Sequence, residues 1–227
     1  MLLSYYGHSC FYVFFEGKHL LFDPFIKGNP LAQHIDIEEI KADYILISHG
    51  HGDHVGDAIE IAQKTGAKII SNFEIVSWLD NQGVKGYALN QGGKYSFDFG
   101  MVKMVSACHS ATLPDGSNGG NPNGFVVWSH NHCFYFAGDT ALSYDMKLIP
   151  LTCPKLDFAI LPMGDVFTMG VEDACIAADF CEVKTVIAAH FDTFDPIKID
   201  HEAAISTFLN NDIKLIIPEI GKAVNWE

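Results

Sequence analysis

A dense group of polar side chains follows the apolar segment "YILI" near the start of the chain. The stretch "SHGHGDH" contains His49, His51, Asp53 and His54 within six positions. Imidazole and carboxylate are the ligands that zinc and similar divalent ions prefer. Residues two apart point the same way in an extended segment, so His49 and His51 are expected to bind one ion. The turn into the following helix then directs Asp53 and His54 toward a second ion.

Three further residues of the same kind occur later in the chain, namely His109, Asp139 and His190. Each lies just past the end of an apolar strand-like segment, where alternating strand and helix architectures place their sites. Together with the first group they offer seven potential ligands from four strand ends, enough for two metal centres. The carboxylate of Asp139 could bridge the two ions. A solvated polar turn would explain the first group alone, but it leaves the three distant partners without an explanation.

Other histidines lack such a context. We expect five of them to be ordinary surface or core residues, because an isolated histidine is more often one of these than a ligand. They are His19, His34, His130, His132 and His201. Asp57 is likewise expected to face solvent from a helix.

The elements that must position these ligands follow from the hydrophobic pattern. Hairpins or strand pairs are predicted over 9–25, 94–110 and 125–140, and single buried strands over 42–48, 67–72, 156–164, 184–190 and 213–219. Helices are predicted over 54–66, 73–83, 171–182 and 200–211. Both halves begin with hairpins and continue with strand and helix alternation. The predicted fold is α/β: one domain over 1–227, built as a four-layer αββα sandwich.

Charge and composition limit the partners. The formal net charge is -14, from 14 basic against 28 acidic residues. Nucleic-acid affinity depends on basic side chains that neutralise phosphates, so a nucleic-acid partner is not expected. An anionic small molecule remains open as the substrate, because bound metal ions can reverse the local field. A homo-oligomer is also left open.

The cysteines and the apolar runs bear on location. Six cysteines include no C-x-x-C pair and lie mostly in apolar runs, so we expect them to be reduced. No apolar run approaches the roughly 18 to 20 residues of a membrane span. The expected location is the cytoplasm, without a membrane partner.

The motifs resemble a known family. "SHGHGDH" resembles the H-x-H-x-D-H signature of the metallo-β-lactamase fold superfamily, and the resemblance spans nearly the whole chain. "YYGHSCF", "LLFDPFI", "AGDT", "LPMGDVFTMG" and "AAHFDTFDPI" look like the UPF0173 group of metal-dependent hydrolases, which is similar to the ascorbate-6-phosphate lactonase branch. The resemblance implies one ion held by His49, His51 and His109, a second held by Asp53, His54 and His190, and Asp139 as the bridge.

The resemblance also implies roles for three residues outside the ligand set. Asp23 would support the ligand loop from behind, although an Asp-Pro turn at a strand end is an alternative. His8 could orient a ligand or donate a proton, or be an ordinary core histidine. Asp165 could contact substrate or only cap a turn. Members of the group typically carry Asn where this chain has Val166, so a polar contact at that position is in doubt.

The predicted function is hydrolysis of a small ester, lactone or phosphoester by water that two divalent ions activate. Zn²⁺ is favoured, with Mn²⁺ or Fe²⁺ as alternatives, and the catalytic residues would be Asp53, Asp139 and His8. A phosphodiesterase or nuclease of the same fold and a non-catalytic metal-binding sensor are the competing functions. The polar loop 113–124 follows His109 closely and would act either as a lid or as a plain linker.

Overall fold

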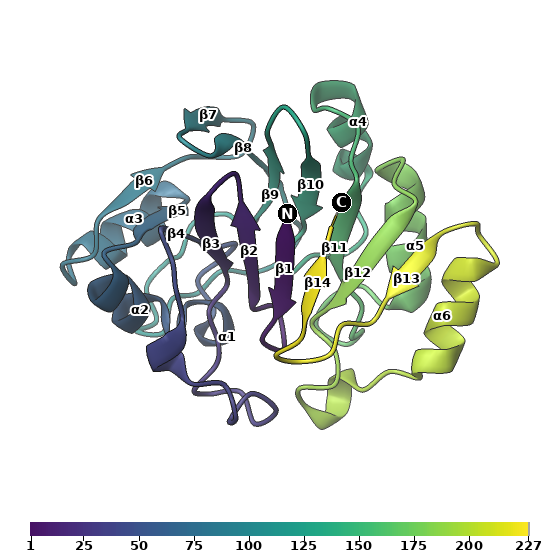
Figure 1. Ribbon diagram of the computed structural model, residues 1–227, viewed down its shortest axis with the longest axis horizontal. Coiled ribbons are helices and arrows are strands. Elements are labelled where there is room, and N and C mark those ends of the chain that lie inside the picture. Colours follow the sequence, from purple (N-terminus) through teal and green to yellow (C-terminus); the bar gives the residue numbers. More distant parts are fainter. Residues whose placement is uncertain (227) are drawn as a thin grey trace.

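Two seven-stranded β-sheets form the centre of the molecule, as seen in a computed structural model that describes residues 1–226 (Figure 1). The first sheet has the order β14 (Ala223–Asn225), β1 (Leu2–Tyr5), β2 (Phe11–Phe15), β3 (Lys18–Phe22), β4 (Tyr44–Leu46), β5 (Lys68–Ser71) and β6 (Gly86–Ala88). The second has the order β13 (Lys214–Ile216), β12 (Thr185–Ala189), β11 (Phe158–Pro162), β10 (Cys133–Phe136), β9 (Asn123–Trp128), β8 (Gly100–Ser106) and β7 (Lys94–Phe97).

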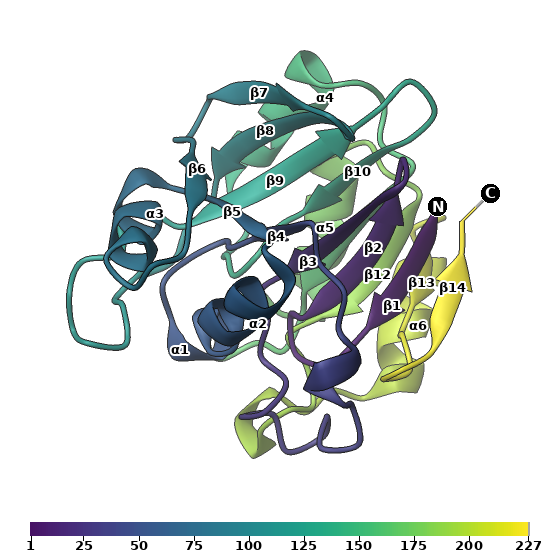
Figure 2. The ribbon, with the colours of Figure 1, turned by 60° about the vertical axis from the view of Figure 1, so that its left-hand side comes forward.

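Helices cover the outer faces of both sheets (Figure 2). The α-helices are α1 (Gly52–Val55), α2 (Ala58–Thr65), α3 (Phe73–Asp80), α4 (Leu148–Thr152), α5 (Val171–Phe180) and α6 (His201–Leu209). Short 3-10 helices span Ile37–Glu39, Tyr144–Lys147 and Asp195–Ile197. Helices α2 and α3 pack on the first sheet, and α5 and α6 pack on the second. The predicted α/β fold and its four-layer arrangement are therefore confirmed.

Each sheet changes from antiparallel to parallel pairing at one strand. In the first sheet β1, β2 and β3 are antiparallel, and β3 to β6 are parallel. The second sheet is antiparallel from β7 to β10 and parallel from β10 to β13. The hairpin between β2 and β3 turns at Glu16 and Gly17, both with positive φ (48° and 78°), as a tight two-residue turn requires. Parallel strands then bring successive carboxyl ends to one edge of each sheet.

A layer of aromatic rings holds the two sheets together. Phe22 of β3 lies with its ring centroid 4.8 Å from Phe136 and 5.9 Å from Phe134, both on β10. All three side chains are buried. Burying one such ring stabilises the fold by about 1.5 to 3 kcal/mol. This packing fixes the two sheets relative to each other, and with them the strand ends that carry the predicted ligands.

Both faces of strand β4 are buried, one against the second sheet and the other against helices. Leu46 points into the core between the sheets, whereas Ile45 and Ile47 pack under the helices of the first half. A strand buried on both faces reads as a nearly continuous apolar run, as "YILI" does.

Several sequence-based expectations were incomplete or wrong. The edge strands β6 and β14 and the short helix α4 were not predicted. Asp57 does not face solvent: it is buried, and its Oδ2 accepts hydrogen bonds from the backbone N–H groups of Ile26 (2.5 Å) and Lys27 (3.0 Å). The carboxylate is used to tie down the loop after β3, a contact between segments that helical periodicity cannot reveal.

None of the helices in residues 1–226 combines the length and the apolar character needed to cross a bilayer.

Candidate metal centre

Four strand ends deliver the predicted ligands to one place. His49 follows β4, His109 follows β8, Asp139 follows β10, and His190 comes directly after β12. The side chains of His49, Asp139 and His190 are buried, and His109 is partly so. Residues far apart in the sequence thus meet because parallel and antiparallel strands of both sheets end at a shared edge.

Asp139 lies at the middle of this group. Its Oδ2 is 3.0 Å from His190 Nε2 and 3.3 Å from His54 Nε2. The same oxygen is 3.6 Å from His109 Nε2 and 4.0 Å from His49 Nε2. One carboxylate therefore faces four imidazoles, two from each of the predicted ligand sets, which is the position a bridging ligand requires.

The first predicted set is assembled by the fold. Ligand atoms of His49, His51 and His109 all lie within 4.8 Å of one another. His49 Nε2 and His51 Nδ1 are 3.0 Å apart. Two imidazole nitrogens at this distance need a shared proton or a shared cation between them.

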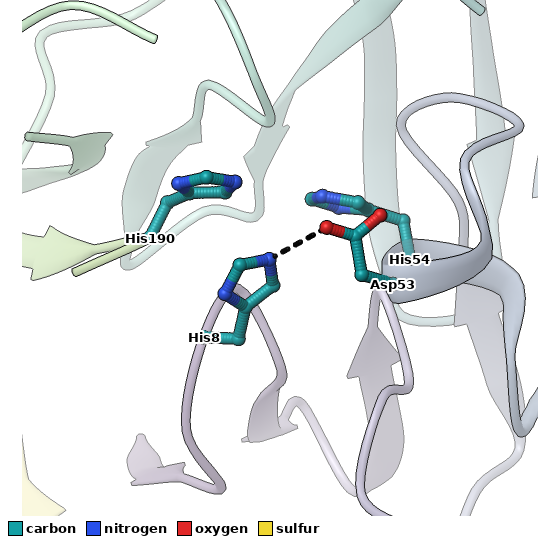
Figure 3. Close-up of side chains that lie close together, drawn as sticks. All are labelled: His8, Asp53, His54 and His190. Carbon is teal, nitrogen blue, oxygen red and sulfur yellow. Dashed lines mark hydrogen bonds and ion pairs between the residues drawn. The ribbon is translucent and has the colours of Figure 1, made fainter. Parts of the chain in front are cut away.

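The second predicted set is also assembled, with one addition. Asp53, His54 and His190 approach one another, and His8 joins them, all four ligand atoms lying within 4.8 Å (Figure 3). His8 Nε2 is 3.1 Å from Asp53 Oδ2. The backbone N–H of His190 also donates to the carbonyl of His8 at 2.7 Å, so the "YYGHSCF" segment is fixed directly against a predicted ligand.

Asp23 holds the ligand loop from behind, in agreement with the supporting role that the motif implies. Its Oδ1 accepts the backbone N–H of Ser48 (2.7 Å), and its Oδ2 contacts Ser48 Oγ (2.6 Å) and His54 Nδ1 (2.7 Å). Ser48 Oγ lies 2.9 Å from His49 Nδ1. Both imidazoles are thereby held by Nδ1, which leaves Nε2 of each directed at the centre. Ser48 was not singled out from the sequence, although it directly precedes the ligand motif.

Comparison with known proteins decides the family. The sequence model of a protein family described as the beta-lactamase superfamily domain matches residues 2–190 of this chain. A UPF0173 metal-dependent hydrolase of Flavobacterium johnsoniae is 51% identical over 224 residues, covering 99% of both chains. The chain belongs to the UPF0173 group of metal-dependent hydrolases. A second member, from Methylacidiphilum infernorum, is 50% identical over 225 residues and covers 99% of both chains.

A solved structure supports the same placement of this UPF0173 protein. A metallo hydrolase from the archaeon Ignicoccus hospitalis superposes with a TM-score of 0.89 at 32% identity, covering 100% of this chain and 98% of the other. The similarity therefore extends over the whole sandwich. The resemblance found in the motifs is confirmed at the level of superfamily and group, while the lactonase branch stays a prediction.

The buried imidazole nitrogens and carboxylate oxygens at this site of the UPF0173 protein are suited to bind divalent ions. Asp139 Oδ1 is buried and has no hydrogen-bond partner within residues 1–226, and His54 Nε2 makes no well-directed hydrogen bond there although it lies 3.3 Å from Asp139 Oδ2. Leaving one such atom unpaired costs about 1 to 3 kcal/mol. Imidazole nitrogens with carboxylate oxygens are a ligand set typical of zinc and of similar ions. A cation between these groups would satisfy the unpaired atoms and offset the carboxylate charge.

Electrostatics in this protein favour a positive charge at the centre. Burial opposes protonation of His54, but the carboxylates of Asp139 and Asp23 outweigh it and hold the pKa of His54 well above its usual value. Burial would raise the pKa of Asp139, yet His54 and His190 hold it well below the usual range. At His49, by contrast, burial dominates and lowers the pKa far below its usual value. Without a metal, a proton on His54 supplies the missing charge.

A metal-induced change in protonation follows for the UPF0173 protein. His54 is expected to be an imidazolium in the metal-free protein at pH 7, because its pKa is raised, and to lose one proton when Zn²⁺ binds, because a ligand nitrogen must be unprotonated. Histidine ¹⁵N chemical shifts before and after zinc addition measure this directly. His49 serves as the internal control and should be neutral in both states. A neutral His54 in the metal-free protein would contradict the assignment.

Asp165 is not brought into the ligand sets. It is exposed at the end of β11, and its Oδ1 accepts the backbone N–H of the next residue, Val166, at 2.9 Å. This contact caps the turn, and a contact of Asp165 with substrate stays a prediction. The five histidines expected to be ordinary take no part in the ligand groups found in residues 1–226; His132 pairs with Asp157, and His201 with Asp192.

The polar loop 113–124 forms a wall beside the ligand turn. Leu113 is buried and packs closely against Gly50. A Cβ added to Gly50 would lie 3.1 Å from Leu113 Cδ2. The side-chain amide of Asn72 donates to the carbonyls of Gly119 (2.7 Å) and Asn121 (3.0 Å). The loop is thus tied to the first half, and its last two residues already belong to β9. Whether it also moves as a lid stays a prediction.

Proposed function

We propose that this metal-dependent hydrolase cleaves a small ester, lactone or phosphoester with a pair of divalent ions, Zn²⁺ in the first place and Mn²⁺ or Fe²⁺ as alternatives. The observation that carries the proposal is the Asp139 carboxylate within 3.0 to 4.0 Å of four imidazoles from two ligand sets. One ion would be held by His49, His51 and His109. The other would be held by Asp53, His54 and His190, with Asp139 shared.

A pair of divalent ions supplies Lewis acidity and a water acidic enough to attack near neutral pH. The protein supplies the groups that move and position the proton. Asp53 is the ligand residue suited to this, because its side chain is 32% exposed. Burial raises the pKa of Asp53, but the hydrogen bond from His8 and the nearby His54 outweigh it and keep the carboxylate ionised. If Oδ2, which accepts from His8, is also the oxygen that holds the ion, Oδ1 would remain to accept the proton of the attacking water and pass it to the leaving group.

His8 is assigned a positioning role in this scheme. Burial lowers the pKa of His8 to about 4, so the ring is neutral at neutral pH and carries one proton. Because Asp53 is anionic, the proton belongs on Nε2, which donates to Asp53 Oδ2 at 3.1 Å. Nδ1 then accepts from the hydroxyl of Thr193 at 3.0 Å. Thr193, His8 and Asp53 form a chain of contacts that fixes the direction of the carboxylate.

Replacing His8 tests this role. His8→Ala is expected to weaken binding of one of the two ions by about 10- to 100-fold and to lower kcat/KM in step, because Asp53 loses the hydrogen bond from His8 that orients its carboxylate. His8→Gln should restore much of the affinity, since its side-chain amide N–H can still donate. Chelator competition measures the affinities. The shape-matched Thr193→Val is expected to have a smaller effect in the same direction, and wild-type affinity in His8→Ala would argue against the positioning role.

The competing functions separate in one experiment. A lactone, a carboxylic ester and bis(p-nitrophenyl) phosphate are offered to the chelator-treated protein, the zinc-reloaded protein and Asp139→Ala. Zinc-dependent turnover that Asp139→Ala lacks supports the hydrolase, and turnover of the phosphodiester alone favours the phosphodiesterase alternative. Absence of any metal-dependent turnover overturns the proposal and leaves the sensor.

The proposed partner is a small molecule, because a chain of net charge -14 has little to offer a polyanion. The six cysteines are unpaired. Free thiols persist in reducing compartments, so we propose a cytoplasmic location.

A further inference from the structure

A strained and exposed apolar turn follows strand β11. Asp165 and Val166 both have positive φ, 59° and 52°. A β-branched residue adopts this conformation only at a cost in free energy. Val166 is 64% exposed and Phe167 is 55% exposed, so burial of their side chains within the protein offsets little of this free-energy cost. Strained positions of this kind cluster at active sites and ligand-binding segments, so this turn is a candidate for contact with a substrate.

The position of the turn connects it to the metal centre. Strand β11 lies between β10 and β12 in the sheet, and the segments that follow these two neighbours carry Asp139 and His190. The backbone N–H of Met169, at the end of the turn, donates to the carbonyl of Thr140 at 3.0 Å. At its beginning, a Cβ on Gly164 would clash with the carbonyl oxygen of His190. The turn therefore rests directly on the backbone of two predicted ligand segments.

Other apolar groups lie at the same edge. Phe194 is 38% exposed, with its ring centroid 5.7 Å from that of His8. The half-buried Phe25 approaches His8 from another loop, at 5.6 Å between centroids. Apolar rings from two loops thus flank His8, which contacts Asp53 of the second ligand set.

Cationic side chains that could bind an anionic substrate are scarce here. The chain contains no arginine. Two lysines in loops at this end, Lys27 and Lys198, are paired with Glu60 and Asp195, each at 2.7 Å.

Next to the turn, a cavity of about 280 Å³ has Lys198 as its one cationic lining residue and three acids, namely Asp165, Glu172 and Asp200. An anionic group near the turn would meet a net negative charge.

We propose, on the basis of the hydrolase function above, that Val166 and Phe167 contact the substrate and that the substrate is an uncharged carboxylic ester or lactone with an apolar chain. Hydrolysis adds one water across the acyl C–O bond. The water oxygen bonds to the acyl carbon, the bond from that carbon to the alcohol oxygen breaks, and the released oxygen takes the proton. The apolar chain packs against the turn and does not react.

A pair of lactones that differ only in the apolar chain, γ-butyrolactone and γ-nonalactone, tests the proposal. Phe167→Ala is expected to lower kcat/KM for γ-nonalactone by about 10- to 100-fold, which corresponds to losing the burial of one aromatic side chain against the substrate. The kcat/KM for γ-butyrolactone should not change. Leu209→Ala is the matched control, because Leu209 is a 70% exposed apolar residue at the far end of α6. It should change neither rate.

Val166→Asn supplies a second readout. Asn tolerates positive φ better than Val, so the variant is expected to raise Tm by about 2 to 4 °C while lowering kcat/KM for γ-nonalactone. A purely structural role for Val166 would not combine higher stability with lower activity.

The outcomes distinguish this inference from the proposed function. Equal effects of Phe167→Ala on both lactones, a lower Tm in Val166→Asn, or a wild-type preference for bis(p-nitrophenyl) phosphate over γ-nonalactone would overturn the apolar-substrate inference alone. A zinc-loaded wild type that hydrolyses none of these three compounds would overturn the hydrolase function itself.

Discussion

Asp139→Asn is expected to reduce kcat/KM by about 10³-fold or more, the scale seen when a group central to an active site is removed. The carboxylate lies 3.0 Å from His190 and 3.3 Å from His54 on one side, and 3.6 Å from His109 on the other. All of these distances are from one oxygen, Oδ2, and an amide oxygen at that place carries no negative charge with which to hold two cations. Steady-state rates and the metal content after dialysis, measured on the same sample, check the prediction.

A matched control keeps this result interpretable. Asp157 is also a carboxylate that pairs with an imidazole, His132, at 3.3 Å, but its side chain is 36% exposed and lies outside the ligand groups. Asp157→Asn should retain wild-type turnover and metal content. If Asp139→Asn did the same, the bridging role would be refuted.

Asp23→Ala is expected to lower the free energy of unfolding of the metal-free protein by about 3 to 5 kcal/mol, the range for breaking a buried charged pair. The Asp23 carboxylate is fully buried and accepts from Ser48 N, Ser48 Oγ and His54 Nδ1 at 2.6 to 2.7 Å. Removing it leaves these donors without a partner and leaves the charge on His54 half compensated. Urea denaturation of the metal-free protein measures the loss, and zinc affinity should fall in parallel.

The control for this variant is Asp36→Ala. Asp36 is exposed and accepts a single backbone N–H, that of Glu38 at 2.9 Å, in front of a 3-10 helix. Its removal should cost about 1 kcal/mol or less, as for an ordinary cap. A loss of that small size in Asp23→Ala would mean that the buried network does not hold the ligand loop.

Much of the clustering of the predicted ligands could be predicted from the sequence because its signals are local. His49, His51, Asp53 and His54 lie together after an apolar strand, and His190 follows another directly. Parallel strands bring such ends to one edge whatever the details of packing, so the pattern predicts proximity. The four-layer fold was predicted for the same reason, from strand and helix periods repeated in two halves.

Contacts between distant segments could not be read in this way. His8 and Thr193 are 185 positions apart, and nothing in either local sequence indicates that their side chains meet. Ser48 looks like an ordinary strand-end serine until Asp23 is placed beside it. Asp57 was wrongly expected to face solvent, because the helical pattern gives no sign of the backbone groups it binds. The strain at Val166 is a property of backbone angles, which composition does not reveal.

Anomalous X-ray diffraction from zinc-loaded crystals, recorded on both sides of the zinc absorption edge, tests the central claim most directly. We predict two peaks per chain: one enclosed by His49, His51 and His109, the other by Asp53, His54 and His190, with Asp139 in contact with both. A single peak, or peaks away from these side chains, would contradict the two-ion centre.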